Sequence, residues 1–265
     1  MNLDLDGKRA LVTGSTLGIG RGIAEALVAE GAEVIVNGRD ADRVEITVSE
    51  LSKFGSVTGF AADLSTLAGA AELADYARSR GHIDILVNNA GYFEVKEFWD
   101  LEEADWKRSF ELNVMSGVRL AREFLRPMLD GNWGRVIFIA SEQSSKPNPS
   151  MIHYAMSKTA QISIARGLAE LTTGTNVTVN SVRVAPTWTN GVQAFMNQAA
   201  KTEDSTAEEM SLAYFEDGEG SSSLLERWAT PAEIANVVTF LCSPRASAIN
   251  GASTRVDGGM IRSLF

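Results

Sequence analysis

Cysteine is almost absent from this sequence. Cys242 is the only one among 265 residues, so the chain can form no intrachain disulfide, and chains without disulfides are typical of reducing compartments. Basic residues are also in the minority, with 24 Lys and Arg against 34 Asp and Glu and a net charge of −10. This balance disfavours nucleic acid as a main partner, although it allows one phosphorylated ligand in a local site. We therefore expect a cytoplasmic protein that binds no nucleic acid.

Long hydrophobic runs are also missing. The apolar stretches at 34–36 and 136–140 have the length of strands, far short of the roughly 20 residues that a membrane-spanning helix needs. Residues 1–7 are acidic and lack the basic start and apolar centre of a secretory signal. The sequence thus predicts no membrane association.

What the sequence does contain is a regular alternation of short β-branched runs with longer amphipathic stretches. Strands are predicted at residues 9–13, 33–37, 57–62, 83–88, 135–141, 177–184 and 253–256. Helices are predicted at residues 18–30, 41–53, 66–80, 102–129, 150–171 and 231–241. Parallel neighbours need such crossover connections. We predict a single α/β domain over residues 1–265, with a doubly wound, parallel, seven-stranded sheet and a partly helical insert at about 186–228.

The loop after the first strand, TGSTLGIG at 13–20, is rich in glycine and runs into a helix. Glycine permits sharp turns and close approach to a diphosphate, while the helix N-terminus offers free N–H groups. The alternative is a glycine-rich turn without a ligand, but the position after the first strand favours a dinucleotide cofactor. The residues predicted to contact it here are Gly14, Ser15, Thr16, Gly18, Ile19 and Gly20.

The end of the second strand bears on the choice of cofactor. Arg39 is the first charged side chain beyond it, and a guanidinium pairs well with a 2′-phosphate, so NADP(H) is favoured over NAD(H). Asp40 follows directly, and a small change of register would let it bind a ribose 2′-hydroxyl instead. Asp63 and Leu64, at the end of the third strand, are further predicted cofactor contacts. Asp63 either accepts a hydrogen bond from the adenine amino group or caps the next helix.

Four residues further along suggest the chemistry. Tyr154 and Lys158 lie four apart on a predicted helix and so share a face. Ser141 ends the fifth strand, at the edge where α/β proteins bind ligands, and Asn113 lies within a predicted helix. Reduction of a carbonyl leaves an alkoxide that needs a proton, which Tyr154 is predicted to supply. We expect the Lys158 ammonium and an oxidised nicotinamide to lower the pKa of Tyr154 from its usual 10.

With these motifs in place, the chain resembles the short-chain dehydrogenase/reductase family over nearly its whole length. The matching stretches are TGSTLGIG, NNAG at 88–91, Asn113, Ser141, YAMSK at 154–158 and VDGG at 256–259. The resemblance implies a Rossmann fold, a Ser-Tyr-Lys triad assisted by Asn113 through a proton relay, and usually a homotetramer. No metal site is predicted. It also implies cofactor contacts from Asn89, Ala90, Gly91, Tyr154, Lys158, Thr187 and Thr189. One departure is Val184-Ala185, which stands where the family commonly has Pro-Gly.

The substrate is a small molecule whose identity the sequence leaves open. Residues 186–227 resemble the family's substrate lid, and their aromatic side chains either enclose an apolar substrate or pack internally. Pocket candidates are Phe93, Gln143, Met151 and Trp188; structural roles are favoured for Glu142 and His153. The sequence predicts an NADP(H)-dependent oxidoreductase, and the alternative is a non-catalytic dinucleotide sensor or scaffold with the same fold. The intact Ser-Tyr-Lys set favours the enzyme, since a sensor has no need of Tyr154.

Overall fold

A computed structural model of the chain describes residues 2–202 and 205–264. All seven predicted strands are present and pair in parallel in the order β3-β2-β1-β4-β5-β6-β7. They are β1 (Arg9–Val12), β2 (Glu33–Gly38), β3 (Val57–Ala61), β4 (Ile85–Asn88), β5 (Gly134–Ser141), β6 (Val177–Val184) and β7 (Ser253–Val256). The predicted doubly wound sheet in one domain is confirmed, and the order reverses between β1 and β4.

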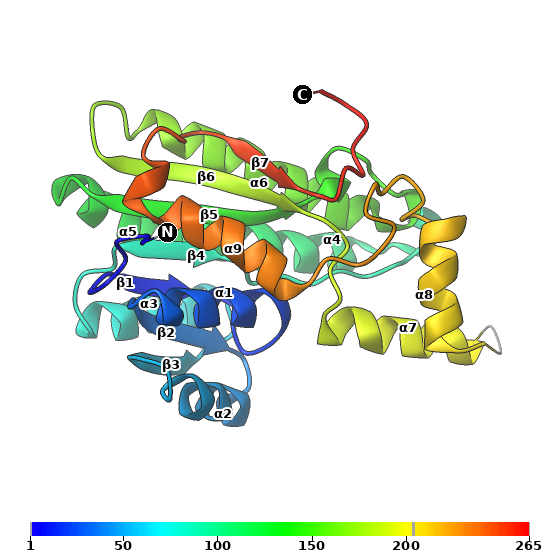
Figure 1. The fold of residues 1–265 in the computed structure, drawn as a ribbon, viewed down its shortest axis with the longest axis horizontal. Helices are drawn as coiled ribbons and strands as arrows, with labels where there is room; N and C mark the ends of the chain where they lie inside the picture. The colour runs from blue at the N-terminus through cyan, green and yellow to red at the C-terminus, as the bar shows by residue number, and fades with distance from the viewer. Residues whose placement is uncertain (1, 203–204, 265) are drawn as a thin grey trace.

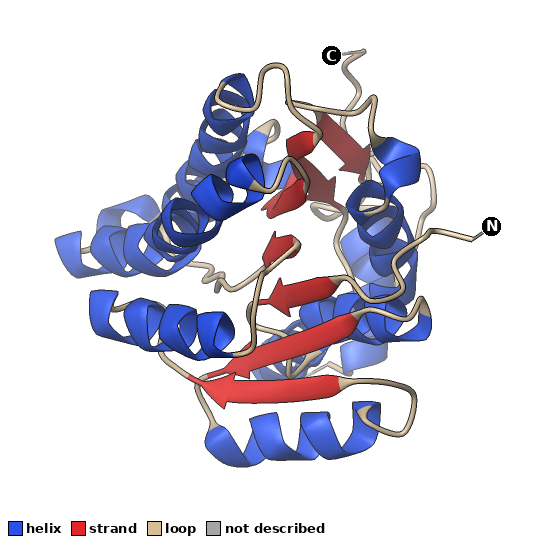
Figure 2. Cartoon of the chain, turned by 90° about the vertical axis from the view of Figure 1, so that its left-hand side faces the viewer, coloured by secondary structure: helices blue, strands red, loops and turns tan. Residues whose placement is uncertain are grey.

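Helices cover both faces of this sheet (Figure 2). One face packs against α1 (Gly18–Ala29), α2 (Ala41–Leu51) and α9 (Pro231–Cys242), and the other against α3 (Leu67–Ser79), α5 (Ser116–Asp130) and α6 (Ile152–Glu170). The side chains of a strand alternate between the two cores. In β1, Ala10 and Val12 join the core that holds Ile23 of α1, whereas Leu11 joins the core that holds Leu73 of α3. Burial on both faces explains the near-continuous apolar strands.

The helix predicted over 102–129 is interrupted. It consists of α4 (Glu103–Ser109), a π-helical stretch η2 (Phe110–Met115) and α5. Asn113 is fully buried within the π-helical stretch, and its side chain forms hydrogen bonds to Tyr92 and Ser157. A π-bulge inside an α-helix is frequent at functional sites.

The carboxyl ends of the strands point to the side of the molecule where α7 (Asn190–Thr202) and α8 (Ala207–Glu216) project (Figure 1). These helices belong to the insert predicted at about 186–228, of which residues 203–204 lie outside the described residues. Short helical turns complete the chain: η1 (Phe98–Asp100), η3 (Glu142–Ser144), η4 (Pro149–Met151) and η5 (Pro244–Ala246). Among the described residues, no helix is long and apolar enough to cross a membrane.

Candidate active site

The glycine loop between β1 and α1 is shaped by close backbone contacts. Gly14 and Gly18 have φ of +59° and +57°, which side chains other than glycine rarely adopt. A Cβ on Gly20 would lie 2.3 Å from both the Asn89 amide nitrogen and the Gly14 carbonyl oxygen. All three glycines are therefore required by the turn itself, which leaves the N-terminus of α1 open at the carboxyl edge of the sheet.

The NNAG segment after β4 is tied to this loop. The Thr13 hydroxyl accepts hydrogen bonds from the backbone N–H groups of Asn89 and Ala90, at 3.0 and 2.9 Å. The Asn89 amide donates to the carbonyls of Thr13 and Gly14, at 2.9 and 3.0 Å. A Cβ on Gly91 would meet Asn113 Oδ1 at 3.1 Å and Lys158 Nζ at 3.6 Å. The segment thus links the glycine loop to the predicted catalytic residues.

At the end of β2, the two charged residues differ in their contacts. Asp40 caps α2, since its side chain accepts a hydrogen bond from the Arg43 N–H at 3.1 Å, and it pairs with the Arg43 guanidinium. Arg39 is exposed and forms no ion pair with any described residue. A Cβ on Gly38 would contact Thr16 Cγ2 at 2.8 Å, so Thr16 sits against this strand end. Because Asp40 caps α2 and pairs with Arg43, Arg39 is the charged side chain at this strand end that is left to contact a ligand.

Asp63 does not cap α3, so one of its two predicted alternatives is wrong. Thr66 is the cap, accepting a hydrogen bond from the Gly69 N–H at 3.0 Å. Asp63 Oδ1 instead accepts from the Ser65 N–H at 3.0 Å in the turn before the helix, and Leu64 is buried in the core. The α3 helix begins too late for Asp63, because the turn 63–66 intervenes.

Several other predicted cofactor contacts have structural uses. The buried Ser15 hydroxyl donates to the Val12 carbonyl and accepts from the Asn37 N–H. The buried Thr187 hydroxyl donates to the Ala185 carbonyl at 2.8 Å. The hydroxyl protons of both residues are therefore used within the protein, and the Ser15 N–H also donates to the Asn37 carbonyl at 2.8 Å.

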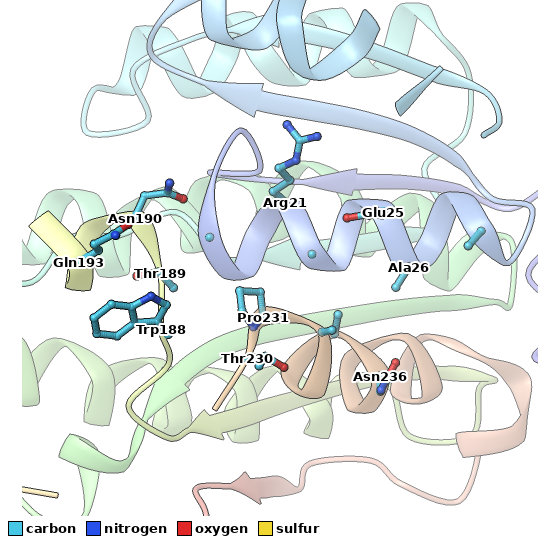
Figure 3. Close-up of a pocket in the computed structure, with 15 residues that line it drawn as sticks. Arg21, Glu25, Ala26, Trp188, Thr189, Asn190, Gln193, Thr230, Pro231 and Asn236 are labelled. Atoms are coloured by element: carbon cyan, nitrogen blue, oxygen red, sulfur yellow. The ribbon is translucent and has the colours of Figure 1, made fainter. Parts of the chain in front are cut away.

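Thr189 lies against the glycine loop, because a Cβ on Gly18 would contact its Cγ2 at 3.2 Å. It stands with Trp188 at one end of a groove between α1 and α9 (Figure 3). Ile19 packs against the core beneath α1. Trp188 also contacts Trp228, with ring centroids 5.5 Å apart. The described contacts of Trp188 thus place it on the glycine-loop side of the molecule.

Lys158 is held at the centre of the site. Its buried ammonium donates to the Ile139 carbonyl at 2.7 Å and to Gln161 Oε1 at 3.1 Å. Nζ lies 5.6 Å from the centre of the Tyr154 ring, so the two side chains share one face of α6 as the spacing predicted. Burial lowers the pKa of Lys158 to about 8, against a partly compensating effect of nearby Glu142.

Asn113 is fixed by three hydrogen bonds from its side chain. Oδ1 accepts from the Tyr92 N–H at 2.9 Å, and Nδ2 donates to the Tyr92 carbonyl and to Ser157 Oγ at 3.0 and 2.9 Å. Its own carbonyl accepts a 2.6 Å hydrogen bond from Gln161 Nε2. Gln161 therefore connects Asn113 directly to Lys158.

Ser141, at the end of β5, lies next to a buried carboxyl group. Its Oγ is 2.5 Å from Glu142 Oε2 in a hydrogen bond and accepts from the Gln143 N–H at 3.2 Å. Gln143 Nε2 donates to Glu142 Oε1 at 3.2 Å, while its Oε1 accepts from the Asn148 N–H at 2.8 Å. Burial raises the pKa of Glu142 above its ordinary value.

The expected lowering of the Tyr154 pKa is wrong for the protein alone. Burial of the phenol, and then the charge of Glu142, raise the pKa of Tyr154, while Ser141 opposes the shift. The reason is that the Lys158 ammonium points to Ile139 and Gln161 rather than to the phenol oxygen. A raised pKa keeps the phenol protonated, as a proton donor must be.

Aromatic side chains flank Tyr154 on its open side. Phe93 packs edge-on against Tyr154 and against Phe195 of α7, with centroid distances of 6.4 and 6.3 Å. Met151 is half-buried at the start of α6. His153 is buried, with a pKa lowered by burial.

The Val184-Ala185 departure is accommodated without strain. Ala185 is not among the residues with positive φ, and its N–H donates to the Val256 carbonyl at 2.8 Å, extending the pairing of β6 with β7. Both side chains are buried in the core. Glycine is therefore not needed for this backbone conformation.

Glu142 and Gln161 are the residues whose part in the site the sequence reasoning missed. Gln161 lies three residues after Lys158, so the helical spacing that paired Lys158 with Tyr154 also placed Gln161 within reach. No comparable signal marked Glu142, because its contacts depend on the turn η3 after β5.

Comparison with known proteins agrees with this geometry. A family model described as "short chain dehydrogenase" matches residues 8–200. The chain belongs to this family. The oxidoreductase YvrD of Bacillus subtilis (strain 168) is 52% identical over 264 residues, all of both chains. The 7alpha-hydroxysteroid dehydrogenase of Escherichia coli (strain K12) is 34% identical over 99% of this chain and 98% of its own.

Among solved structures, the L-sorbose reductase of Gluconobacter frateurii, complexed with NADPH and L-sorbose, superposes with a TM-score of 0.94. It is 31% identical to this chain, and the match covers 100% of both chains. As a short-chain dehydrogenase, the chain is an oxidoreductase with a nicotinamide cofactor, of a family that acts on alcohol and ketone groups.

Proposed function

We propose that this short-chain dehydrogenase reduces a ketone, or oxidises the corresponding secondary alcohol, with NADP(H) and with Tyr154 as general acid or base. The observation that carries the proposal is a continuous line of contacts from Gly14 through Ala90 to Gly91, and from Gly91 to Lys158 beside Tyr154. It runs along the carboxyl edge of the sheet next to the β1–β4 reversal, the usual ligand site of such folds.

The residues at this edge fit a dinucleotide phosphate. The tight turn around Gly14, Gly18 and Gly20 leaves the N-terminus of α1 open for the diphosphate. Arg39 is free of ion pairs with described residues, so its guanidinium is available to a 2′-phosphate. Gly91 leaves room beside Asn113 and Lys158, and this is where a nicotinamide ribose would be held.

When bound, the nicotinamide supplies or accepts the hydride. The chain's own residues handle the proton. Tyr154, protonated because of its raised pKa, donates to the alkoxide oxygen that forms from the carbonyl. Ser141 holds that oxygen by a hydrogen bond, and Lys158, fixed by Ile139 and Gln161, supplies positive charge beside the resulting phenolate.

The insert at about 186–228 is proposed to act as the substrate lid. Phe195 of α7 reaches Phe93 beside Tyr154, so movement of α7 would change the apolar wall of the pocket. Tyr214 of α8 stacks on Trp228 with ring centroids 4.5 Å apart. The aromatic group around Trp228 thus packs internally, whereas Phe93 and Phe195 are left to contact the substrate. Gln143 and Met151 lie close in sequence to Ser141 and Tyr154 and are proposed as further pocket residues.

A homotetramer is proposed from the family resemblance. Apolar side chains near α4 support self-association, with Trp99 88% exposed and Phe98 and Phe110 also exposed. Sedimentation velocity tests this, since a monomer at micromolar concentration would overturn it.

A panel of ketones and secondary alcohols, assayed with NADP(H) and NAD(H), tests the proposed function. We expect NADPH oxidation with at least one small ketone and a loss of at least about a thousandfold in kcat for Tyr154→Phe. Binding of NADPH without turnover on any carbonyl would favour the sensor alternative. Turnover that survives Tyr154→Phe would refute the assigned acid.

A further inference from the structure

Glu142 is a carboxyl group that the proposed reaction does not use, yet it touches the serine that does. It is 5% exposed, and its oxygens contact Ser141 Oγ at 2.5 Å and Gln143 Nε2 at 3.2 Å. No described cation forms an ion pair with it, because the Lys158 ammonium is directed to Ile139 and Gln161. A buried carboxyl without a salt bridge favours its protonated form.

The protonation of Glu142 decides where the single hydroxyl proton of Ser141 points. Ser141 Oγ already accepts from the Gln143 N–H, so its remaining needs are one donor and one acceptor. If Glu142 is ionised, its carboxylate can only accept hydrogen bonds, so the Ser141 hydroxyl donates its proton to Glu142. If Glu142 is protonated it donates to Ser141 Oγ, and the Ser141 proton is free for the substrate oxygen.

We propose that Glu142 is a positioning residue which, as a carboxylic acid, donates to Ser141 Oγ and thereby directs the Ser141 hydroxyl to the substrate carbonyl oxygen. The inference rests on the proposed function, because it assigns Ser141 the task of holding that oxygen. Deprotonation of Glu142 reverses the hydrogen bond and withdraws Ser141 from the substrate. Carbonyl reduction therefore falls as the pH rises through the titration of Glu142.

The groups around Glu142 come from two helices. Tyr154 and Lys158 on α6 and Tyr214 on α8 are close enough to interact with its charge, and Glu219, after α8, also acts on Tyr214. Hydrogen bonds from Ser141 and Gln143 favour the ionised carboxyl, whereas burial favours the acid, and burial is the larger effect. The two phenols stay neutral to a higher pH than an ordinary tyrosine, because burial raises the pKa of each.

Glu142→Gln separates proton donation from charge. Its amide can donate to Ser141 Oγ at every pH, so kcat for ketone reduction should lose the fall that Glu142 ionisation causes in the wild type. Glu142→Ala removes the donor and should lower kcat about 10- to 100-fold across the pH range. Glu72→Gln, the same change on an exposed side chain of α3 far from the proposed lid, should keep the wild-type profile.

A second comparison asks whether the effect passes through Ser141. In a Ser141→Ala background, Glu142→Ala should cause no more than about a twofold further loss, because the group it positions is gone. Equal losses in both backgrounds would overturn the proposal, as would a Glu142→Gln profile that follows the wild type or a Gln variant as slow as the Ala variant.

A spectroscopic measurement is independent of turnover and of any substrate. The infrared difference spectrum between pH values on either side of the Glu142 titration should contain the C=O stretch of a protonated carboxyl, and Glu142→Gln should remove it. Absence of this band from the wild type would overturn the proposal even if the enzyme is active. Its presence in a protein inactive on every carbonyl would leave the protonated pair standing and reject the proposed function instead.

Discussion

Replacing Gln161 by Met would remove the bridge between Lys158 and Asn113 at nearly constant volume. Gln161 is 1% exposed, accepts from Lys158 Nζ at 3.1 Å and donates to the Asn113 carbonyl at 2.6 Å. Methionine fills the same space but offers neither group. Lys158 would keep only the Ile139 carbonyl as an acceptor, and the Asn113 carbonyl would lose its hydrogen bond from Gln161 Nε2.

The expected effect follows from the strength of the lost hydrogen bond. A hydrogen bond to a charged group contributes about 1.5–3 kcal/mol, and one pH unit in a pKa corresponds to about 1.4 kcal/mol. The pKa of Lys158, about 8 in the native protein, should therefore fall by about one to two pH units. At a pH near the native pKa of Lys158, the ratio of protonated to neutral Lys158 would fall about 10-fold or more.

The pH dependence of kcat/KM for ketone reduction measures this change. The limb governed by Lys158 should move to lower pH by about one unit or more in Gln161→Met. Thr159→Ala, an exposed neighbour on the same helix whose hydroxyl bonds only to backbone carbonyls, should leave the profile in place. Coincident profiles for Gln161→Met and the wild type would refute the assigned role of the bridge.

Three further predictions concern the cofactor loop and the cost of the buried ammonium. Arg39→Ala should raise KM for NADPH about 10- to 100-fold and leave KM for NADH within about twofold, and equal effects would remove the 2′-phosphate assignment. Gly20→Ala should lower the free energy of unfolding in urea, because its Cβ falls 2.3 Å from Asn89 Nδ2. Gly167→Ala, whose Cβ would have nothing within 4 Å, should instead raise it by about 0.5–1 kcal/mol. A Gly20→Ala protein as stable as the wild type would contradict the packing. The pKa of Lys158 is lowered on folding, so above pH 8 the unfolded chain holds more protons than the native protein. The unfolding free energy of the wild type should therefore rise between pH 8 and 9.5, relative to that of Lys158→Met, by up to about 2 kcal/mol. Unfolding free energies that change equally with pH in both proteins would show that the ammonium is not buried.

Much of the fold could be predicted because the alternation of elements is strong and local. β6 and β7 begin and end where the pattern predicted, at Val177–Val184 and Ser253–Val256. The π-helical stretch Phe110–Met115 could not be predicted from the sequence. It contains Asn113, whose side chain forms hydrogen bonds to Tyr92 and Ser157, and these partners come from other parts of the fold. Periodicity cannot detect a contact made across the fold.

In the candidate site, too, features set by local spacing could be predicted, whereas contacts made across the fold could not. The helical spacing of Tyr154 and Lys158 predicted their shared face, and Lys158 Nζ lies 3.6 Å from the position that a Cβ on Gly91 would take. The electrostatics were not accessible from spacing, because the direction of the Lys158 ammonium is set by the Ile139 carbonyl and by Gln161. The raised pKa of Tyr154 follows from burial and then from the charge of Glu142.

The central claim is that the phenol of Tyr154 delivers the proton in carbonyl reduction, and single-turnover kinetics test it most directly. Wild-type protein and Tyr154→Phe would be loaded with NADPH, checked for equal cofactor affinity by fluorescence, and mixed with a ketone that the wild type reduces. The account predicts rapid NADPH oxidation in the wild type and oxidation at least about a thousandfold slower in Tyr154→Phe. Comparable rates at equal cofactor occupancy would contradict it.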